Sequence, residues 1–440
     1  MEISKKPAII MITSNGVGAG HLIRASSIAR ELKEDFRVII LSMANSVSEV
    51  ANSLGIEYEY IPSKARDIIN KNRYDKYLAA RILALIDETN AKLVTFDSVV
   101  PYRGIQMAKI KRDNIKFIWI RRGLWRRVPN GVNFLEGKIF DYIIEPGDIA
   151  ESYDNGPTAK RKDALRFSPV TLYNKKYTHN KEDARKILKI SESKKNILIQ
   201  LGINDLEDKN KVTAIINGIN EYSNLEIIFT KKPSDEIIEL ISKEHSYKVI
   251  RYFPLADVIH GFDALIGAAG YNTVHEAIPA KIPTLLIANT RGTDDQHLRA
   301  KFCSDSNLVL HASSDDYESI QKCVKELLND SSILRYTKLQ NNLELTGAYD
   351  IANFIKNIIG DKNKKTKKIK NFFIYYYSKK NIKRVIIKIL YYLLFFFIKI
   401  YRVYKPRITR EENVFKEDLL RGHSERYKIN RENITNKLLK

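Results

Sequence analysis

The segment from Ser14 to Leu32, SNGVGAGHLIRASSIAREL, carries the residues of this chain that are best suited to chemistry. Its alternating glycines, which include Gly18 and Gly20, let the backbone turn sharply and approach a ligand closely. The helix pattern that follows would point its free N–H groups at this turn, which favours an anion. His21 and Arg24 lie one helical turn apart on the same face, and imidazole groups exchange protons near neutral pH. The alternative is a tight turn that binds nothing.

A second glycine segment, GAAGYNTVHEA, begins at Gly267 and opens another helix pattern. The backbone N–H groups after Gly270, with the Asn272 and Thr273 side chains, can bind a pyrophosphate. One turn further, Glu276 can accept hydrogen bonds from two ribose hydroxyls. The alternative for this glutamate is a helix acid that the helix dipole stabilises.

Polar residues also follow the next predicted strand, where the sequence is DDQ over residues 294–296. Asp295 and Gln296 can bind sugar hydroxyls, whereas Asp294 is equally suited to cap the helix that starts here. Together with the two glycine segments, these residues favour a ligand-binding site over a set of ordinary turns.

Arginines cluster directly after a predicted strand of the first half. The segment IRRGLWRR contains Arg121, Arg122, Arg126 and Arg127, which could bind phosphate groups through bidentate contacts. The alternative is an exposed basic loop. Asp97 also follows a predicted strand, and we expect it to cap the next helix rather than to contact an acceptor.

These residues require a fold that brings strand ends together, and the patterns predict an α/β protein with two doubly wound, Rossmann-like domains facing a cleft. Apolar runs predict strands over 8–13, 37–42, 57–61, 92–96, 115–120 and 141–144, and then over 196–201, 225–230, 247–251, 263–266 and 283–288. Residues 166–180 predict a linker. We expect one domain over residues 1–170, a second over 171–360 whose last helix crosses back to the first, and a tail over 361–440.

Composition limits the class of protein. The 440 residues include two cysteines, Cys303 and Cys323, which are too few for a disulfide framework. The N-terminus does not resemble a signal peptide. Of the net charge of +22, residues 361–440 supply +16, with 23 Lys and Arg against 7 Asp and Glu. The rest of the chain is therefore only mildly basic, and no zinc-finger spacing suggests a nucleic-acid partner.

The tail contains an apolar, aromatic segment over residues 372–404. Its longest uncharged run has ten residues, 389–398, which is too short to cross a bilayer. On a helical wheel, five basic residues share one sector: Lys380, Arg384, Lys388, Lys399 and Arg402. This pattern predicts an amphipathic helix in the plane of an anionic membrane surface. The alternatives are a docking helix for a protein partner and a tilted membrane span.

At residues 253–300 the chain resembles the GT-B glycosyltransferases of the family 28 type, in the glycine segment, the Thr-Val-x-Glu pattern and the Asp-x-Gln pattern. The resemblance covers about residues 7–360. It implies an acceptor-side first domain and a second domain that binds a nucleotide sugar. By position, it implies that the nucleotide base contacts the backbone of Phe253–Leu255.

The same resemblance implies the other contacts of the family by position. The phosphates correspond to Gly270, Asn272 and Thr273, the ribose to Glu276, and the sugar to Asp295 and Gln296. The family's Gly-Gly-His loop corresponds to Gly18, Gly20 and His21. Two positions depart from the family: Asp295 stands where glutamine is usual, and the glycine-serine loop of the second domain is replaced by residues 202–205, GIND.

We therefore expect a glycosyltransferase that moves a hexose or N-acetylhexosamine from a UDP-sugar to a hydroxyl of a membrane-linked acceptor, in bacterial cell-surface glycan synthesis. His21 would act as the general base, and Arg24, Arg121, Arg122 and Arg126 would contact the acceptor or phosphates. We expect no cofactor and no metal, because no Asp-x-Asp motif follows a strand. The expected location is the inner face of the cell membrane. The alternatives are a nucleotide-sugar hydrolase, whose GxGHxxR segment this chain resembles, and a non-catalytic nucleotide-sugar-binding subunit.

Overall fold

The structure is a computed structural model that describes residues 6–14, 19–64, 71–126, 134–201, 208–242, 245–290, 293–329 and 343–361. The predictions for Gly18, for Arg127, for residues 202–205 and for the tail helix lie outside the described residues. None of the helices within these ranges has the length and the apolar character of a membrane-spanning segment.

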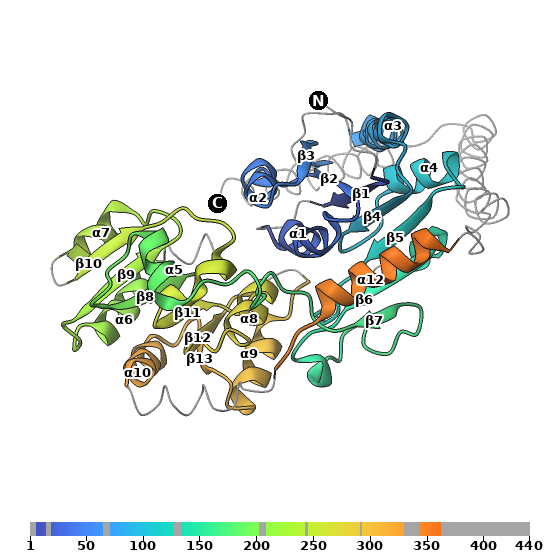
Figure 1. Cartoon of the computed structure of the whole chain (residues 1–440). Helices are drawn as coiled ribbons and strands as arrows, with labels where there is room; N and C mark the ends of the chain where they lie inside the picture. The colour runs from blue at the N-terminus through green and yellow to red at the C-terminus, as the bar shows by residue number, and fades with distance from the viewer. Residues whose placement is uncertain are drawn as a thin grey trace, which may run out of the picture. The chain divides into compact units, whose positions relative to one another are not determined.

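Seven parallel strands form the first sheet, in the order β3-β2-β1-β4-β5-β6-β7 (Figure 1). The strands are β1 (Ala8–Thr13), β2 (Arg37–Ser42), β3 (Glu57–Tyr60), β4 (Leu93–Asp97), β5 (Lys116–Ile120), β6 (Tyr142–Pro146) and β7 (Leu165–Phe167). The helices between them are α1 (Gly20–Leu32), α2 (Val47–Ser53), α3 (Lys71–Thr89), α4 (Arg103–Lys111) and the 3-10 turns η2 (Phe134–Ile139) and η3 (Glu151–Tyr153). Every residue of β1 is buried, as an apolar run covered on both faces requires.

The strand order reverses between β1 and β4, which lie side by side although 79 residues separate Thr13 from Leu93 in the sequence. Thr13, the last residue of β1, is aligned with Asp97, the last residue of β4. Ligands of doubly wound sheets bind at such a reversal, beyond the carboxyl ends of the strands. Because α1 follows β1, its first turn begins at this position.

Six parallel strands form the second sheet, in the order β10-β9-β8-β11-β12-β13. They are β8 (Lys195–Gln200), β9 (Leu225–Phe229), β10 (Ser246–Val249), β11 (Ala264–Ala268), β12 (Thr284–Ala288) and β13 (Leu310–Ser313). The helices are α5 (Lys181–Leu188), α6 (Lys209–Ile219), α7 (Asp235–Ser242), η4 (Leu255–Gly261), α8 (Tyr271–Ala277), α9 (Gln296–Asp305) and α10 (Tyr317–Leu328). The order reverses between β8 and β11, so α8 starts at the second reversal. Two doubly wound sheets confirm the predicted α/β class.

The last described helix, α12 (Gly347–Gly360), packs against elements of the first sheet (Figure 1). Its buried residues Ile351 and Ile355 belong to the same apolar cluster as Ile28 of α1. The Phe354 ring makes an edge contact with Tyr142, at a centroid distance of 5.2 Å. The chain thus returns to its first half after the second sheet, while the domain boundaries at residues 170 and 360 stay predictions.

Two short edge strands differ from the predicted elements. Residues 165–167 form β7, so the sheet extends into the segment that we expected to be a linker from residue 166. Residues 310–313 form β13, which the sequence did not indicate. Both are edge strands of three or four residues with partly exposed side chains, and such strands lack the continuous apolar run on which the prediction depends.

Candidate active site

His21 lies in the first turn of α1 and is paired with the residue that ends β4. Its Nδ1 atom is 2.6 Å from Oδ1 of Asp97. The His21 side chain is 12% exposed and the Asp97 side chain is completely buried. Within the described part of the chain, Nε2 of His21 has no hydrogen-bond partner. One ring nitrogen is therefore anchored in the protein, and the other is left for a ligand.

Asp97 also binds Arg24, which donates from Nε to Oδ2 at 2.7 Å and from its terminal nitrogen to Oδ1. Burial opposes ionisation of Asp97, but the charge of Arg24 and the hydrogen bonds from His21 outweigh it, so the pKa of Asp97 lies below its usual value. An ionised carboxylate only accepts hydrogen bonds, so Nδ1 of His21 carries its proton toward Asp97. The pair has the geometry of a general base held by a carboxylate.

Our expectation that Asp97 caps a helix is wrong. Helix α4 begins at Arg103, and the residue at its cap position is Tyr102. The carboxylate of Asp97 turns instead toward α1, because β4 lies next to β1 in the sheet. The alternative, a contact between Asp97 and an acceptor, gains no support either, because the buried carboxylate is paired with His21 and Arg24.

Arg24 links this pair to the start of α8 in the second half of the chain. Its guanidinium carbon lies 5.6 Å from the centre of the Tyr271 ring. The Tyr271 hydroxyl accepts a hydrogen bond from the Val170 backbone and donates one to the Gly147 carbonyl, both at 2.9 Å. The first residue of α8 is thus fixed against the first half of the chain, beside the helix that carries His21.

The residues assigned to the phosphates and the sugar approach one another around Gly270, which caps α8. A Cβ atom placed on Gly270 would lie 3.9 Å from Nε2 of Gln296 and 3.9 Å from Oγ1 of Thr273, with nothing closer. Asn272 is half-buried on the same turn. Gly20, at the start of α1, faces open space, since a Cβ there would have no neighbour within 4 Å. Both helix starts therefore leave room for a ligand beside their backbone.

Glu276 is half-buried in the second turn of α8. Burial raises the pKa of its carboxyl to about 8, and the charge of the nearby Asp257 adds to this rise. Among the described residues, none donates a hydrogen bond to this carboxyl. A carboxyl with unfilled acceptor capacity suits a ligand that supplies hydroxyl donors.

The expected sugar-binding residues have partners of their own. Asp295 caps α9, because its Oδ1 accepts a hydrogen bond from the Leu298 backbone at 3.1 Å. Gln296 accepts from the Asn289 backbone at 3.1 Å and donates to Asp294 at 3.4 Å. The capping role that we considered for Asp294 therefore belongs to Asp295.

The segment expected to contact the base leads into the 3-10 turn η4, which begins at Leu255, and its Phe253–Pro254 peptide bond is cis. Phe253 packs against the apolar cluster of the first sheet, whereas Leu255 packs against a cluster of the second. Further along η4, Asp257 accepts two hydrogen bonds from Arg30 of α1, at 2.8 and 2.7 Å. This buried ion pair was not predicted.

The three described arginines of the cluster have different surroundings. Arg121 has no exposed surface, and its guanidinium donates to Glu145 at 2.9 Å and to Asp163 at 3.0 Å. This pairing leaves no surface of Arg121 for a phosphate, contrary to our expectation. Arg122 is directed toward the loop before α9, whereas Arg126 is partly exposed and donates its backbone N–H to Thr293 at 3.1 Å.

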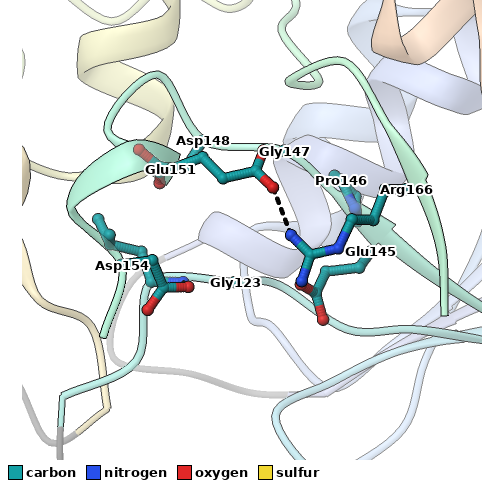
Figure 2. A pocket seen from close by; sticks show the side chains of 9 residues that line it. Gly123, Glu145, Pro146, Gly147, Asp148, Glu151, Asp154 and Arg166 are labelled. Atoms are coloured by element: carbon teal, nitrogen blue, oxygen red, sulfur yellow. Dashed lines mark hydrogen bonds and ion pairs between the residues drawn. The ribbon is translucent and has the colours of Figure 1, made fainter. Parts of the chain in front are cut away.

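A pocket lies beside this cluster, at the carboxyl ends of β5 and β6 (Figure 2). The Arg166 side chain extends into it and forms ion pairs with Glu145, at 3.2 Å, and with Glu151. Asp154 accepts a hydrogen bond from the Leu124 backbone at 2.9 Å. The pocket has a free volume of about 10 Å³, which is room for about one water molecule. The charged side chains that line the pocket therefore pair with one another, and the space between them is too small for a sugar.

A buried ion network connects the two halves near residues 293–296, the loop that we expect to bind the sugar. Arg299 of α9 donates to Asp148 at 2.8 Å and to Asp294 at 2.9 Å, and to the Ala269 carbonyl at 2.8 Å. His275 accepts a hydrogen bond from the Ile149 backbone at 3.0 Å, so it is a structural residue. Of these residues, Asp148 and Arg299 were missed, because only the contact between the two sheets brings them together.

Comparisons with known proteins bear on the architecture of the two sheets. Residues 182–358 match the model of the glycosyltransferase family 28 C-terminal domain. Residues 182–358 of the chain therefore resemble a family 28 C-terminal domain. This match and the paired sheets confirm the resemblance to GT-B glycosyltransferases of the family 28 type. No curated protein sequence matches the chain at a significant level.

Solved structures share the fold at low identity. MurG of Acinetobacter baumannii is 15% identical, with 80% of this chain and 100% of that chain covered and a TM-score of 0.53. CalG4, the calicheamicin glycosyltransferase, is 15% identical, with 82% and 100% covered and a TM-score of 0.52. A putative UDP-N-acetylglucosamine 2-epimerase from Listeria monocytogenes is 14% identical, with 81% and 98% covered and a TM-score of 0.58. The GT-B fold therefore extends over both sheets, and the family 28 domain supports sugar transfer as the activity.

Proposed function

We propose that this chain transfers a hexose or N-acetylhexosamine from a UDP-sugar to a hydroxyl of a membrane-linked acceptor. The observation that carries the proposal is the pairing of His21 with the buried, ionised Asp97 at the reversal point of the first sheet. Through Arg24 and Tyr271, this pair is in contact with the start of α8, to which we assign the phosphates of the donor. A proton acceptor therefore lies next to the expected position of the donor.

In the proposed reaction, Nε2 of His21 takes the proton of the acceptor hydroxyl while the hydroxyl oxygen bonds to the anomeric carbon. The bond between this carbon and the phosphate oxygen breaks, and UDP leaves as an anion. Asp97 holds the ring in the tautomer that leaves Nε2 free, and stabilises the positive charge that His21 acquires. The N–H groups after Gly270, with Asn272 and Thr273, stabilise the leaving diphosphate.

The remaining donor contacts are proposals from the resemblance to the family. Glu276 accepts hydrogen bonds from the ribose hydroxyls, and the backbone of Phe253–Leu255 contacts the base. Asp295 and Gln296 bind the sugar. The reaction needs no cofactor and no metal in this scheme, since helix N–H groups and Arg126 supply the charge stabilisation.

Residues 361–440, the tail, supply the proposed attachment to the membrane. A basic amphipathic helix over residues 372–404 would hold the enzyme on the anionic inner face of a bacterial cell membrane, where a lipid-linked acceptor is available. The chain would then act in the synthesis of a cell-surface glycan. A free sugar acceptor would not require such a tail.

The test is a screen of nucleotide sugars for UDP release, with and without a membrane lipid extract. We expect release that depends on the extract and that is lost in His21→Ala. Release without the extract, with free sugar as the product, would support the nucleotide-sugar hydrolase instead, because the His21–Asp97 pair could equally activate water. Binding of UDP without release under either condition would support a non-catalytic binding subunit.

A further inference from the structure

A segment of the first half of the chain pairs with the loop that precedes α9. Trp125 and Asp294 form an antiparallel β-bridge. The Arg126 N–H donates to the Thr293 carbonyl at 3.1 Å, and the Asp295 N–H donates to the Leu124 carbonyl at 3.2 Å. The backbone after β5 therefore holds the sugar-binding loop directly, through hydrogen bonds that need no particular side chain.

Arg122 adds a side-chain contact to this bridge. One terminal nitrogen lies 3.1 Å from Oδ1 of Asp294, and the other donates to Oγ1 of Thr293 at 2.8 Å. The side chain is only 13% exposed. Its Nε–H is buried and has no hydrogen-bond partner among the described residues. Such a buried donor is costly, and native proteins nearly always satisfy it.

Asn289 presents a second buried donor at the same loop. It follows β12 and is 6% exposed, and its Nδ2 group has no partner in the described structure. The Asn289 backbone N–H donates a hydrogen bond to the Gln296 side chain. Gln296 in turn donates to Asp294, and Arg122 contacts the same aspartate. The two unsatisfied donors thus belong to one hydrogen-bonded group of side chains around the sugar-binding loop.

The Asp294 carboxylate of this group already accepts hydrogen bonds from several side chains. Asp294 accepts from Arg299 at 2.9 Å and from Gln296 at 3.4 Å, besides its contact with Arg122. Asp294 therefore has little capacity left for a sugar hydroxyl. What the group still offers is N–H donors, and these bind an oxygen that acts as an acceptor.

We propose that Arg122 and Asn289 are specificity-determining residues that donate hydrogen bonds to acceptor oxygens of the donor sugar. The inference rests on the proposed function and deepens it, because it places a residue of the acceptor-side half in the donor-sugar contact. Sugar binding would then require the bridge between Trp125 and Asp294, whereas binding of the UDP part would not.

The test measures the dissociation constants of UDP and of four UDP-sugars by calorimetry, for the full chain and its variants. The four UDP-sugars are UDP-glucose, UDP-galactose, UDP-N-acetylglucosamine and UDP-glucuronic acid. In the unaltered protein, at least one UDP-sugar is expected to bind about tenfold more tightly than UDP. Arg122→Ala and Asn289→Asp are expected to remove that difference while they leave the UDP constant within about twofold. Asn289→Asp keeps the side-chain shape and removes the donor, and Arg122→Lys should restore part of the difference.

The control is Tyr153→Phe, which removes a hydrogen bond of 2.9 Å to Asp305 between the same two halves but away from the loop. It should keep the full preference for the sugar. A preference that survives both test variants, or a protein that binds UDP but no UDP-sugar more tightly, would overturn the inference and leave the proposed nucleotide site intact. An unaltered protein that does not bind UDP would overturn the proposed function, and the inference with it.

Discussion

Nδ1 of His21 lies 2.6 Å from Oδ1 of Asp97, and this contact joins the first turn of α1 to the end of β4. Arg24 also binds this carboxylate, with its Nε 2.7 Å from Oδ2, so a buried negative charge is shared between two basic side chains. Because the burial of Asp97 is compensated by Arg24, the carboxylate stays ionised and can fix the tautomer of His21. The proposed base is therefore oriented before any substrate binds.

Replacement of Asp97 by asparagine should separate catalysis from donor binding. Without the carboxylate, Nδ1 no longer holds its proton against a charge, and His21 loses both its tautomer and the partner of its cationic form. We expect kcat to fall about 10²- to 10⁴-fold, with the dissociation constant of UDP changed less than about threefold. Initial rates of UDP release and calorimetric titration with UDP measure the two quantities.

Asp97→Asn also leaves the buried Arg24 without its charge partner, so the variant should unfold at a lower temperature. His21→Ala serves as the second variant, because it keeps the Asp97–Arg24 pair and should lower turnover without this loss of stability. Asp87→Asn, which removes an exposed partner of Arg112, is the control for the amide substitution. Normal turnover in a folded His21→Ala protein would exclude the proposed base.

Glu276 should make donor binding depend on pH. Burial raises the pKa of its carboxyl to about 8, so the free protein carries it mostly protonated at pH 7. Ribose hydroxyls donate hydrogen bonds and therefore favour the ionised form, so binding should release a proton. The affinity should rise with pH up to about pH 8 and then level off. Calorimetry with UDP-sugars at pH 7, in buffers of different ionisation enthalpy, measures the released protons.

Glu276→Gln provides the matched control, since the amide keeps the shape and does not titrate. It should bind UDP-sugars more weakly by roughly tenfold, and without the additional proton release. The pKa of Glu276 is higher in the folded protein than in the unfolded chain, so the stability of the free protein also depends on pH. The contribution of Glu276 to the free energy of unfolding is fully present below the unfolded pKa. It is lost as the pH rises through about 8. Equal proton release in both proteins would contradict a contact between Glu276 and the ribose.

The sequence was sufficient to predict the elements that carry the candidate site. The apolar run AIIMIT predicts β1 at its observed bounds, and the glycines after it predict the turn into α1. The same pattern predicts β11 and the start of α8 at Tyr271. These predictions succeed because strand burial and helix starts depend on local patterns.

Partners across the sheets could not be predicted in the same way. Asp97 is 76 residues from His21, and only the order of β1 and β4 in the sheet makes them neighbours. Arg121 was assigned to phosphates from its position in a basic run, yet the end of β6 supplies Glu145, which pairs with it. Such pairings follow from the order of the strands in the sheet, and a single sequence contains no local signal for that order.

The ion pair between Arg30 and Asp257 should stabilise the contact between the two halves of the chain. Both side chains are nearly buried, the pair is bidentate at 2.8 and 2.7 Å, and the Arg30 guanidinium lies 3.6 Å from the centre of the Tyr177 ring. Arg30→Ala leaves the Asp257 carboxylate buried without a partner, which should lower the free energy of unfolding by about 3–5 kcal/mol. Urea unfolding followed by circular dichroism measures the change.

The comparison for Arg30 is Arg37→Ala, which removes an equally short contact of 2.7 Å with Glu57 on the surface. Exposed pairs contribute little, so the expected loss is about 0–1 kcal/mol. Similar losses in both variants would mean that burial does not determine the strength of the Arg30–Asp257 pair. Because Asp257 also raises the pKa of Glu276, Arg30→Ala should in addition shift the pH range over which UDP-sugars bind.

The close approach of α12 to the first half gives the last prediction. A Cβ on Gly347, the first residue of this helix, would lie 2.0 Å from the backbone oxygen of Ser168 and 2.6 Å from that of Pro169. Backbone atoms cannot move aside as a side chain can, so Gly347→Ala should displace the helix and destabilise the protein by about 1–3 kcal/mol or more. Gly360→Ala, at the other end of α12, has no neighbour within 4 Å of the added carbon and should cost nothing. If thermal unfolding shows the same midpoint for both variants, α12 does not depend on this contact with the first half.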